Sequence, residues 1–288
     1  MSPWLLAARP KTLPAAVVPV WVGNLPALLD GDEQFSWLLL AATLLSCLCI
    51  QIATNLFNDA IDFKKGADTE NRLGPVRVTA TGLLSQKQVM LAAGAFCLLA
   101  AFIAIPLVQA RGWGVVAIGV VSLLLAYGYT GGPVPLAYKG LGEIFVILFF
   151  GLVAVIGSFW VQTGIWPAPQ AVVIFAVQTG LLSAAMIAIN NLRDTDEDRQ
   201  TGKRTLAVRF GKTYARSEVT AFCLGPVALA AVSGNWLVFL LLPLSLFVVK
   251  GVWKNDPGPV YNKLLAISGL QLLAFAVLLT LDLRFFGA

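Results

Sequence analysis

Two groups of acidic and amide residues have the spacing of a metal site. The first runs from Asn55 to Asp62 and includes Asp59, and the second ends in Asp194 and Asp198. Residues three and four positions apart share one face of a helix, so each group presents a pair of carboxylates with amide oxygens beside it. Mg²⁺ relieves the repulsion between such carboxylates and also binds substrate phosphates. Charges that only solvate helix ends would explain one group, but not two matched ones. We therefore expect a magnesium and phosphate site where the groups meet.

Basic residues follow each acidic group along the chain. Arg72 and Arg77 come after the first group, and Lys203 and Arg204 come after the second. Carboxylates that hold a metal ion, next to Arg and Lys side chains that bind phosphate oxygens, are the composition of a diphosphate site. The alternative is that these cations only anchor loops at a membrane surface. Their position beside both acidic groups favours the diphosphate site.

The residue types that are absent narrow the chemistry further. The chain contains no histidine, which excludes Ser-His-Asp triads, HExxH zinc sites and His-ligated haem. A general base must then be Asp, Glu, Lys, Tyr, Cys or water. The four cysteines lie inside apolar runs and form no CxxC pair, so neither a zinc site nor a disulfide framework is expected.

The elements that position these residues must cross a membrane. The chain is 58% hydrophobic and only 12% charged, against about 25% charged for a soluble domain. A spanning helix needs about 20 mostly apolar residues. Turn residues at 163–167 and at 233–235 divide two long apolar runs that would otherwise be too long for one span. The nine expected spans are 13–29, 35–58, 88–110, 112–130, 141–162, 168–190, 217–233, 236–252 and 263–283.

The distribution of charge predicts how these spans are oriented. With nine spans, 18 of the 20 Lys and Arg residues fall on one side, and only Arg111 and Arg284 fall on the other. The positive-inside rule makes the rich side cytoplasmic, so the N-terminus is expected inside and the C-terminus outside. The acidic groups lie four spans apart and hence on the same side. We expect an all-α polytopic membrane protein with one domain, 1–288, built from two parallel four-helix repeats plus one helix.

These motifs resemble those of the UbiA superfamily of intramembrane aromatic prenyltransferases. That family carries N-D-x-x-D after its second helix and D-x-x-x-D after its sixth, and here they stand as Asn58-Asp59-x-x-Asp62 and Asp194-x-x-x-Asp198. The family's nine-helix fold implies the topology expected from charge. Further segments, among them Arg9 to Pro14, Tyr129 to Pro133 and Gly140 to Glu143, are similar to the branch that prenylates 1,4-dihydroxy-2-naphthoate. Gly66 followed by Asp68 argues against the branch that uses 4-hydroxybenzoate.

The resemblance implies an activity and a set of site residues. The donor would be an allylic polyprenyl diphosphate and the acceptor 1,4-dihydroxy-2-naphthoate, which loses CO₂ to give demethylmenaquinol in menaquinone biosynthesis. Mg²⁺ would neutralise the diphosphate, whose charge rises as the allylic C–O bond breaks. The expected metal ligands are Asn58, Asp59, Asp62, Asp194 and Asp198. The expected substrate-binding residues are Asn55, Asn58, Arg72, Arg77, Tyr129, Tyr138, Lys139, Asn190, Asn191, Lys203 and Arg204.

Two further roles are left to a few candidates. The allylic cation needs aromatic faces, which Tyr127, Tyr129 and Tyr138 could supply unless they only mark the membrane interface. A base for the phenolic proton could be Glu143, at the start of the fifth span, or Asp68. The alternative for Glu143 is an ion pair with Lys139, four residues earlier. The polyprenyl tail needs only an apolar groove open to lipid.

Other functions remain to be weighed against this one. A cation-coupled transporter would place its ionisable residues near the bilayer midplane, whereas here they lie at helix ends on one side. A CDP-alcohol phosphotransferase would need a D-G-x-x-A-R core, which is absent. Another UbiA-type acceptor, or a phytyl donor, stays open because the motifs contact only the diphosphate. If the acceptor is 1,4-dihydroxy-2-naphthoate, we expect a bacterial inner (cytoplasmic) membrane protein whose active site faces the cytoplasm.

Overall fold

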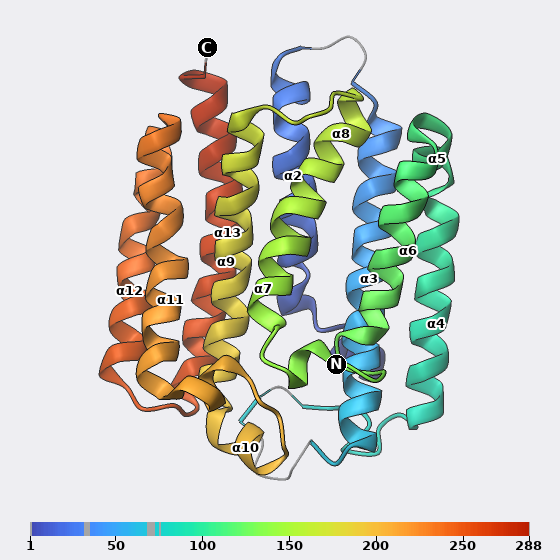
Figure 1. Cartoon of the computed structure of the whole chain (residues 1–288), viewed down its shortest axis with the longest axis vertical. Coiled ribbons are helices and arrows are strands. Elements are labelled where there is room, and N and C mark those ends of the chain that lie inside the picture. Colours follow the sequence, from blue (N-terminus) through green and yellow to red (C-terminus); the bar gives the residue numbers. More distant parts are fainter. Residues whose placement is uncertain (1, 32–34, 68–72, 75, 288) are drawn as a thin grey trace.

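The computed structural model describes residues 2–31, 35–67, 73–74 and 76–287, and no strand occurs among them. The helices run side by side along the long axis of one bundle (Figure 1). In chain order they are α1 (Pro3–Ala8), η1 (Pro10–Thr12), α2 (Pro14–Leu29), α3 (Trp37–Lys64), α4 (Gln86–Ile103), α5 (Ile105–Arg111), α6 (Trp113–Gly128), η2 (Leu136–Tyr138), α7 (Gly142–Val146), η3 (Ile147–Ile156), α8 (Gly157–Thr163), α9 (Gln170–Arg193), α10 (Thr195–Gln200), α11 (Leu206–Ser233), η4 (Trp236–Leu241), α12 (Leu242–Lys254) and α13 (Val260–Phe285).

The expectation of a helical membrane protein is confirmed. Within the described ranges, seven helical segments are long and apolar enough to span a membrane, and an eighth is formed if residues 3–29, which bend by 46°, count as one span. Helix α6 is apolar but only 16 residues long, about 24 Å at 1.5 Å per residue. The ninth span and the orientation of the N-terminus therefore stay predictions.

Both breaks expected inside long apolar runs are present. Helix α8 ends at Thr163 and α11 ends at Ser233, and the next residues, Gly164 and Gly234, have φ of 74°. Glycine adopts this left-handed conformation without a steric penalty, so it ends each helix and lets the chain turn back. The expected span 88–110 is instead two helices, because the chain bends at Ala104 before Pro106.

Helices α3 and α11 are longer than predicted. Helix α3 continues to Lys64 rather than to residue 58, so Asp59 and Asp62 lie in its last two turns. The span expected at 217–233 begins at Leu206 and contains a kink at Gly211. Charged residues lie at the end of α3 and at the start of α11, and each helix continues through them. The apolar pattern alone therefore predicted helices that are too short.

Helix α9 lies in the middle of the bundle, between α7 with η3, α11 and α13 (Figure 1). Its close approach to η3, a π-helix, depends on Gly151 and Gly180. A Cβ added to Gly151 would lie 2.6 Å from the Ala176 carbonyl oxygen, and one on Gly180 would lie 2.9 Å from the Ile147 carbonyl oxygen. This contact keeps η3, and α7 directly before it, close to α9. The end of α9 near α7 is the one expected to face the cytoplasm.

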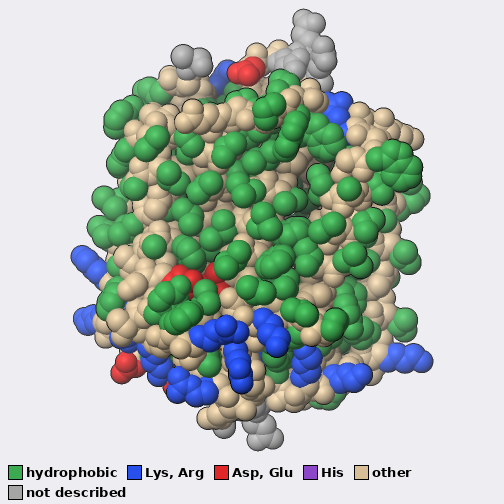
Figure 2. Space-filling view, viewed as in Figure 1, with side chains coloured by type: hydrophobic (Ala, Val, Ile, Leu, Met, Phe, Trp, Pro, Cys, Tyr) green, Lys and Arg blue, Asp and Glu red, His purple; other side chains and the backbone are tan. Residues whose placement is uncertain are grey.

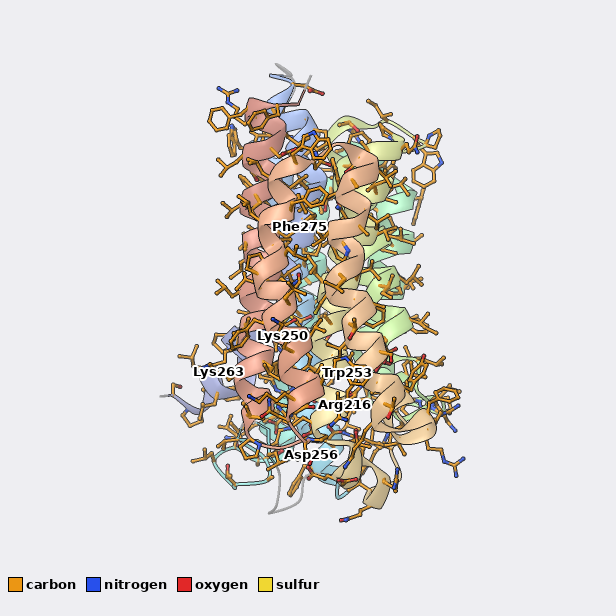
Figure 3. The ribbon with its side chains drawn as sticks, turned by 90° about the vertical axis from the view of Figure 1, so that its left-hand side faces the viewer. Arg216, Lys250, Trp253, Asp256, Lys263 and Phe275 are labelled. Carbon is orange, nitrogen blue, oxygen red and sulfur yellow. The ribbon has the colours of Figure 1, made fainter. Side chains whose placement is uncertain are left out.

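The two ends of the bundle differ in charge. Figure 2 shows Lys and Arg side chains in a belt around the lower end, with hydrophobic side chains covering the middle. On the adjacent face, Lys250, Lys263 and Arg216 lie toward that same end, whereas Phe275 lies in the apolar part (Figure 3). The ends of α3 and α9 and the short helix α10 also lie at the lower end, so both acidic groups are at the basic end (Figure 1). We refer to it as the basic end.

Candidate active site

Asp62 is the most heavily engaged carboxylate at the basic end. Its side chain is fully buried, and it accepts hydrogen bonds from Arg77 Nη2 at 3.1 Å, from the Tyr138 hydroxyl at 2.8 Å and from Lys203 Nζ at 3.3 Å. These donors come from three separate segments, 15, 76 and 141 residues away in the sequence. Two of the three donors are cationic, so the chain's own side chains balance the charge of this buried carboxylate.

Asp59, one turn earlier on α3, has different partners. Its Oδ1 accepts from the backbone N–H of Thr79 at 3.1 Å and from the Thr79 hydroxyl, and its Oδ2 accepts from the backbone N–H of Val78 at 3.3 Å. Its side chain is buried, like those of Arg77, Val78 and Thr79. Asp59 thus binds the backbone of segment 77–79. Arg77, the first residue of that segment, donates to Asp62.

The second acidic group is held mainly by its own neighbour. Arg193 donates from Nε and Nη2 to the two carboxylate oxygens of Asp194, each at 2.7 Å, and Nη2 also donates to Asn190 Oδ1. Arg193 Nη1 donates to Asn262 Oδ1 on α13, and Asn262 Nδ2 donates to the Leu73 carbonyl. Asn262 therefore connects the second acidic group to the loop that follows the first.

Asp198, on α10, lies in surroundings that favour its protonated form. Burial raises the pKa of its carboxyl to about 7; Lys203 opposes that shift, and the charges of Asp194, Glu197 and Asp62 add to it. A carboxylate in this setting gains from any cation that comes near it. Lys203, whose ammonium already touches Asp62, supplies that cation in the structure.

The two acidic groups thus face one chamber, with an ammonium group between them. Lys203 connects the two groups: its Nζ lies 3.3 Å from Asp62 Oδ2, and its backbone N–H donates to the Asp198 carbonyl at 2.9 Å. We call the space around Asp62, Tyr138, Lys203 and Asp198 the chamber. Within the described ranges, no three His, Cys, Asp or Glu side chains converge closely enough to bind a metal ion. The chain's own cations separate the carboxylates instead. The donor set is nevertheless one that suits Mg²⁺, and Lys203 lies between Asp62 and Asp198 as a cation in that place would.

The amide residues of the first group differ in what they do. Asn58 Oδ1 accepts from Arg9 Nη2 at 3.0 Å, and its Nδ2 donates to the Thr130 hydroxyl at 3.0 Å. Asn55 Nδ2 donates to the Ala8 carbonyl and to the Thr12 hydroxyl. Asn55 therefore holds the N-terminal segment against α3, and Asn58 brings Arg9 to the edge of the chamber.

Tyr138 lies between two ammonium groups. Lys65 Nζ is 4.0 Å from its ring centroid and Lys203 Nζ is 5.2 Å from it, while the hydroxyl donates to Asp62. Its ring is therefore already engaged by the chain's own cations. Lys65 Nζ also donates to the Thr130 carbonyl at 2.7 Å, which fixes its position.

Tyr129 occupies the position expected of an aromatic wall. A Cβ added to Gly142 would lie 3.1 Å from its hydroxyl, so Tyr129 lies against the start of α7. It also lines an apolar cavity of about 380 Å³ that runs up the bundle between α3, α6 and η3. Tyr127 packs edge-on against Phe57 and is largely exposed, outside the chamber.

Glu143 is buried beside Tyr129, and the alternative of an ion pair with Lys139 is wrong. Its Oε1 accepts from Asn191 Nδ2 at 2.7 Å, and within the described ranges its buried Oε2 has no hydrogen-bond partner. Lys139 is exposed, and its carbonyl accepts from Arg209. A buried carboxylate oxygen with no donor is able to accept a proton.

The remaining predicted residues divide between the surface and the undescribed part of the chain. Arg204 is exposed; its backbone N–H donates to the Tyr138 carbonyl and its own carbonyl accepts from Arg209. Asp68 and Arg72 lie outside the described residues. Four residues at the site were not among those predicted, although each lies in or next to a motif that was noted: Arg9, Lys65, Thr130 and Arg193.

The fold and this site define an intramembrane prenyltransferase. Residues 16–281 match the model of the UbiA prenyltransferase family, and the chain belongs to that family. It is 32% identical to a 1,4-dihydroxy-2-naphthoate octaprenyltransferase of Haemophilus influenzae, over 95% of this chain and 94% of the other. It is 35% identical to the Bacillus subtilis protein of the same name, over 88% and 82%.

A solved structure shares the fold. A UbiA homolog from Archaeoglobus fulgidus, bound to DMAPP and Mg²⁺, matches with a TM-score of 0.63 at 18% sequence identity. The match covers 96% of this chain and 99% of that one. The resemblance of the motifs to the UbiA superfamily is thereby confirmed at the level of family and fold.

Proposed function

We propose that the protein transfers a polyprenyl group from an allylic polyprenyl diphosphate to 1,4-dihydroxy-2-naphthoate, with loss of CO₂, to give demethylmenaquinol. The observation that carries the proposal is one chamber in which Asp62, Asp198 and several cations lie at the foot of a long apolar cavity. Such a chamber suits a diphosphate joined to an apolar tail. The acceptor follows from the two relatives named for that reaction, which align over most of the chain.

The polar chamber would hold the diphosphate. Arg77, Lys203 and Lys65 place three cationic groups around Asp62, and Arg9 adds a fourth at Asn58. We assign the metal to oxygens of Asn58, Asp62 and Asp198, in line with the Mg²⁺ and DMAPP of the A. fulgidus homolog. Bound Mg²⁺ would neutralise the departing diphosphate. The cations would move from the carboxylates to the phosphate oxygens, and they act most strongly as negative charge develops there.

The expected ligands Asp59 and Asp194 have their oxygens engaged by the protein. Asp59 binds the backbone at residues 78–79, and Asp194 binds Arg193 through both oxygens. Asp194 becomes available to a metal only if Arg193 releases it. Asn190, which shares the same guanidinium, keeps Arg193 in place beside it.

Glu143 is the proposed base, with Asp68 as the second candidate. The acceptor ring would lie against Tyr129, with one hydroxyl near Glu143 Oε2, while Asn191 holds Oε1. The hydroxyl proton passes to Glu143 as a ring carbon bonds to the prenyl carbon and the diphosphate leaves. The bond from that ring carbon to the carboxylate then breaks and CO₂ departs. Its electron pair restores the aromatic ring, and the oxygen takes the proton back from Glu143.

The prenyl tail would lie in the apolar cavity. Its lining runs from Tyr129 and Leu136 near the chamber to Leu107 and Val161 farther along, and it is almost entirely hydrophobic. Apolar walls hold a tail by area and shape and not by hydrogen bonds.

The basic end would face the cytoplasm of a bacterial inner membrane, in which the whole chain acts as one domain. A transporter is disfavoured, because the ionisable residues of the chamber lie at one end of the bundle. Sidedness is tested by single cysteines in a background without the native ones. Lys64→Cys and Thr201→Cys should be labelled from the cytoplasmic side only, and Asp30→Cys from outside only. The opposite pattern would reverse the orientation.

The activity is tested with purified protein, Mg²⁺ and a polyprenyl diphosphate. We expect 1,4-dihydroxy-2-naphthoate to be prenylated with one CO₂ released per transfer, and EDTA to stop the reaction. 4-Hydroxybenzoate should react far more slowly, because one ring leaves a void in a pocket shaped for two. Comparable kcat/KM for both acceptors, or a product that keeps its carboxylate, would assign the chain to another branch of the family.

A further inference from the structure

Asp59 belongs to the motif expected to bind metal, but its contacts are those of a structural anchor. Both of its carboxylate oxygens accept hydrogen bonds from residues 78–79, two of them from backbone N–H groups. We propose that Asp59 is a positioning residue that fixes segment 77–79 so that Arg77 points into the diphosphate chamber, and that it is not a metal ligand. The inference rests on the proposed function for the identity of the donor.

The hydrogen bonds of Asp59 would be costly to exchange for a metal ion. Asp59, Val78 and Thr79 are all buried, with Asp59 only 1% exposed. Turning the carboxylate toward the chamber would leave the backbone N–H groups of Val78 and Thr79 without acceptors inside the protein, and the Thr79 hydroxyl would keep only the Asp59 carbonyl. Each such buried group costs about 1–3 kcal/mol. A metal ion would have to offset all of them, whereas Asp62 needs only to exchange one cation for another.

The geometry links Asp59 directly to Arg77. Val78 is fully buried in the cluster formed by α3, α4 and α6, where it packs with Ala53, Leu56 and Ala60. Asp59 fixes the backbone on either side of the Val78–Thr79 peptide bond, and Arg77 is the residue immediately before it. Arg77 then donates to Asp62, one turn further along α3. The last two turns of α3 therefore hold one segment at two successive points, by its backbone at Asp59 and by its guanidinium at Asp62.

The inference predicts a separation between donor binding and metal binding. Loosening the segment should displace Arg77 and weaken binding of the diphosphate, while the metal ligands stay in place. Two measurements without acceptor report these separately: Mn²⁺ binding followed by electron paramagnetic resonance, and binding of geranyl S-thiolodiphosphate, an unreactive donor analogue. Neither depends on which acceptor the enzyme uses, so a failure of the naphthoate assignment would leave the test intact.

The central variants are Asp59→Asn and Thr79→Val. Asparagine places an N–H₂ group against the Val78 N–H, and valine removes the hydroxyl that Asp59 accepts. Both should weaken analogue binding about tenfold, the effect of one lost hydrogen bond to a charged group, and leave Mn²⁺ affinity unchanged. Thr79→Ser restores the hydroxyl and should restore binding. Thr213→Val makes the same change at an exposed site on α11, away from segment 77–79, and should have no effect on either measurement.

Two comparisons decide the outcome. Asp62→Asn should weaken Mn²⁺ binding, which shows that the assay detects loss of a ligand. In an Arg77→Ala background, Asp59→Asn should add little to the loss of analogue affinity, because both act through the same guanidinium. The proposal is overturned if Asp59→Asn weakens Mn²⁺ binding as Asp62→Asn does, or if its effect on the analogue is undiminished without Arg77. Thr79→Val keeps the test open if Asp59→Asn does not fold.

Discussion

The two acidic groups match in sequence but differ in how their charge is balanced. On α3, Asp62 is neutralised by Arg77 and Lys203 and also accepts a hydrogen bond from Tyr138, and these three residues come from separate segments. At the end of α9, Asp194 is neutralised by Arg193, the residue before it, through two bonds of 2.7 Å. The first arrangement exists only in the folded protein, whereas the second is largely local.

This difference indicates which carboxylates are available for substrate. Cations that reach Asp62 from other segments can transfer to a phosphate without unfolding any element. Arg193 is buried and also binds Asn190 and Asn262, so releasing Asp194 would disturb three contacts at once. We therefore propose that Asp62 is the member of the first group that exchanges ligands, whereas Arg193 with Asp194 mainly stabilises the end of α9. Asp198, with a pKa raised to about 7, is the member of the second group that gains most from a bound cation.

The largest expected effect is the loss of the carboxylates that face the chamber. Asp62→Ala and Asp198→Ala should each lower the rate by about 10²-fold or more, as removal of a preorganised electrostatic contact does. The measurement is single-turnover prenyl transfer by variants shown to be folded and inserted. Asp196→Ala is the matched control on α10, because Asp196 is exposed and pairs only with Lys212 among the described residues. Near wild-type activity in Asp62→Ala and Asp198→Ala would remove the metal assignment.

The next effect concerns stability and separates the two groups directly. Arg193→Ala leaves a buried carboxylate without its paired guanidinium, which costs about 3–5 kcal/mol. Arg77→Ala should cost less, because Lys203 and Tyr138 still donate to Asp62. Thermal unfolding of the detergent-solubilised variants should therefore show a larger fall in Tm for Arg193→Ala. Equal falls would mean that the two groups are held in the same way.

A smaller effect is expected from the hydroxyl of Tyr138. Tyr138→Phe removes one donor to Asp62 but keeps the ring between Lys65 and Lys203. The loss of a hydrogen bond to a charged group predicts about a tenfold rise in the KM for the prenyl diphosphate. Tyr214→Phe, at an exposed position on α11, serves as the matched control. An unchanged KM would show that the ring alone, and not the hydroxyl, orders the chamber.

The smallest effect is expected at the contact between the two groups. Asn262→Ala breaks the link from Arg193 to the Leu73 carbonyl, and both bonds are partly open to water. The bond from Arg193 is charge-assisted, but exposure to water weakens both bonds, so kcat/KM should fall only about threefold. Lys263→Ala, the next and exposed residue on α13, should leave kcat/KM unchanged. A loss as large as that of Asp62→Ala would mean that Asn262 is part of the chamber itself.

Much of the fold could be predicted because membrane helices follow from local composition. The breaks at 163–167 and 233–235 were predicted from turn residues and are confirmed by Gly164 and Gly234. Helices α3 and α11 were predicted too short. Charged residues interrupt the apolar pattern at the end of α3 and at the start of α11, although the helix continues through them. The break between α4 and α5 was not predicted. The residues on both sides of Pro106 are apolar, so the run was taken as one span.

For the site, residue types were easier to predict than contacts. Helical spacing put Asp59 and Asp62 on one face, but only packing shows that one binds a backbone and the other binds cations. Both Lys203 and Arg204 were predicted to bind substrate, but only Lys203 reaches Asp62, whereas the adjacent Arg204 is exposed. A one-residue difference on a loop reverses the direction of a side chain, and no local pattern specifies it.

The sequence by itself determined that this protein lies in a lipid bilayer, that it is helical, and which types of side chain can carry its chemistry. Apolar runs of about 20 residues must cross a bilayer, and a chain without histidine must use carboxylates, amines and hydroxyls. Tertiary structure alone decided which carboxylate meets which cation. Asp62 and Lys203 are 141 residues apart, and their contact exists only because α3, α9 and α10 end at the same level of the bundle. Contacts of that range depend on how whole helices pack, which neither spacing nor composition specifies.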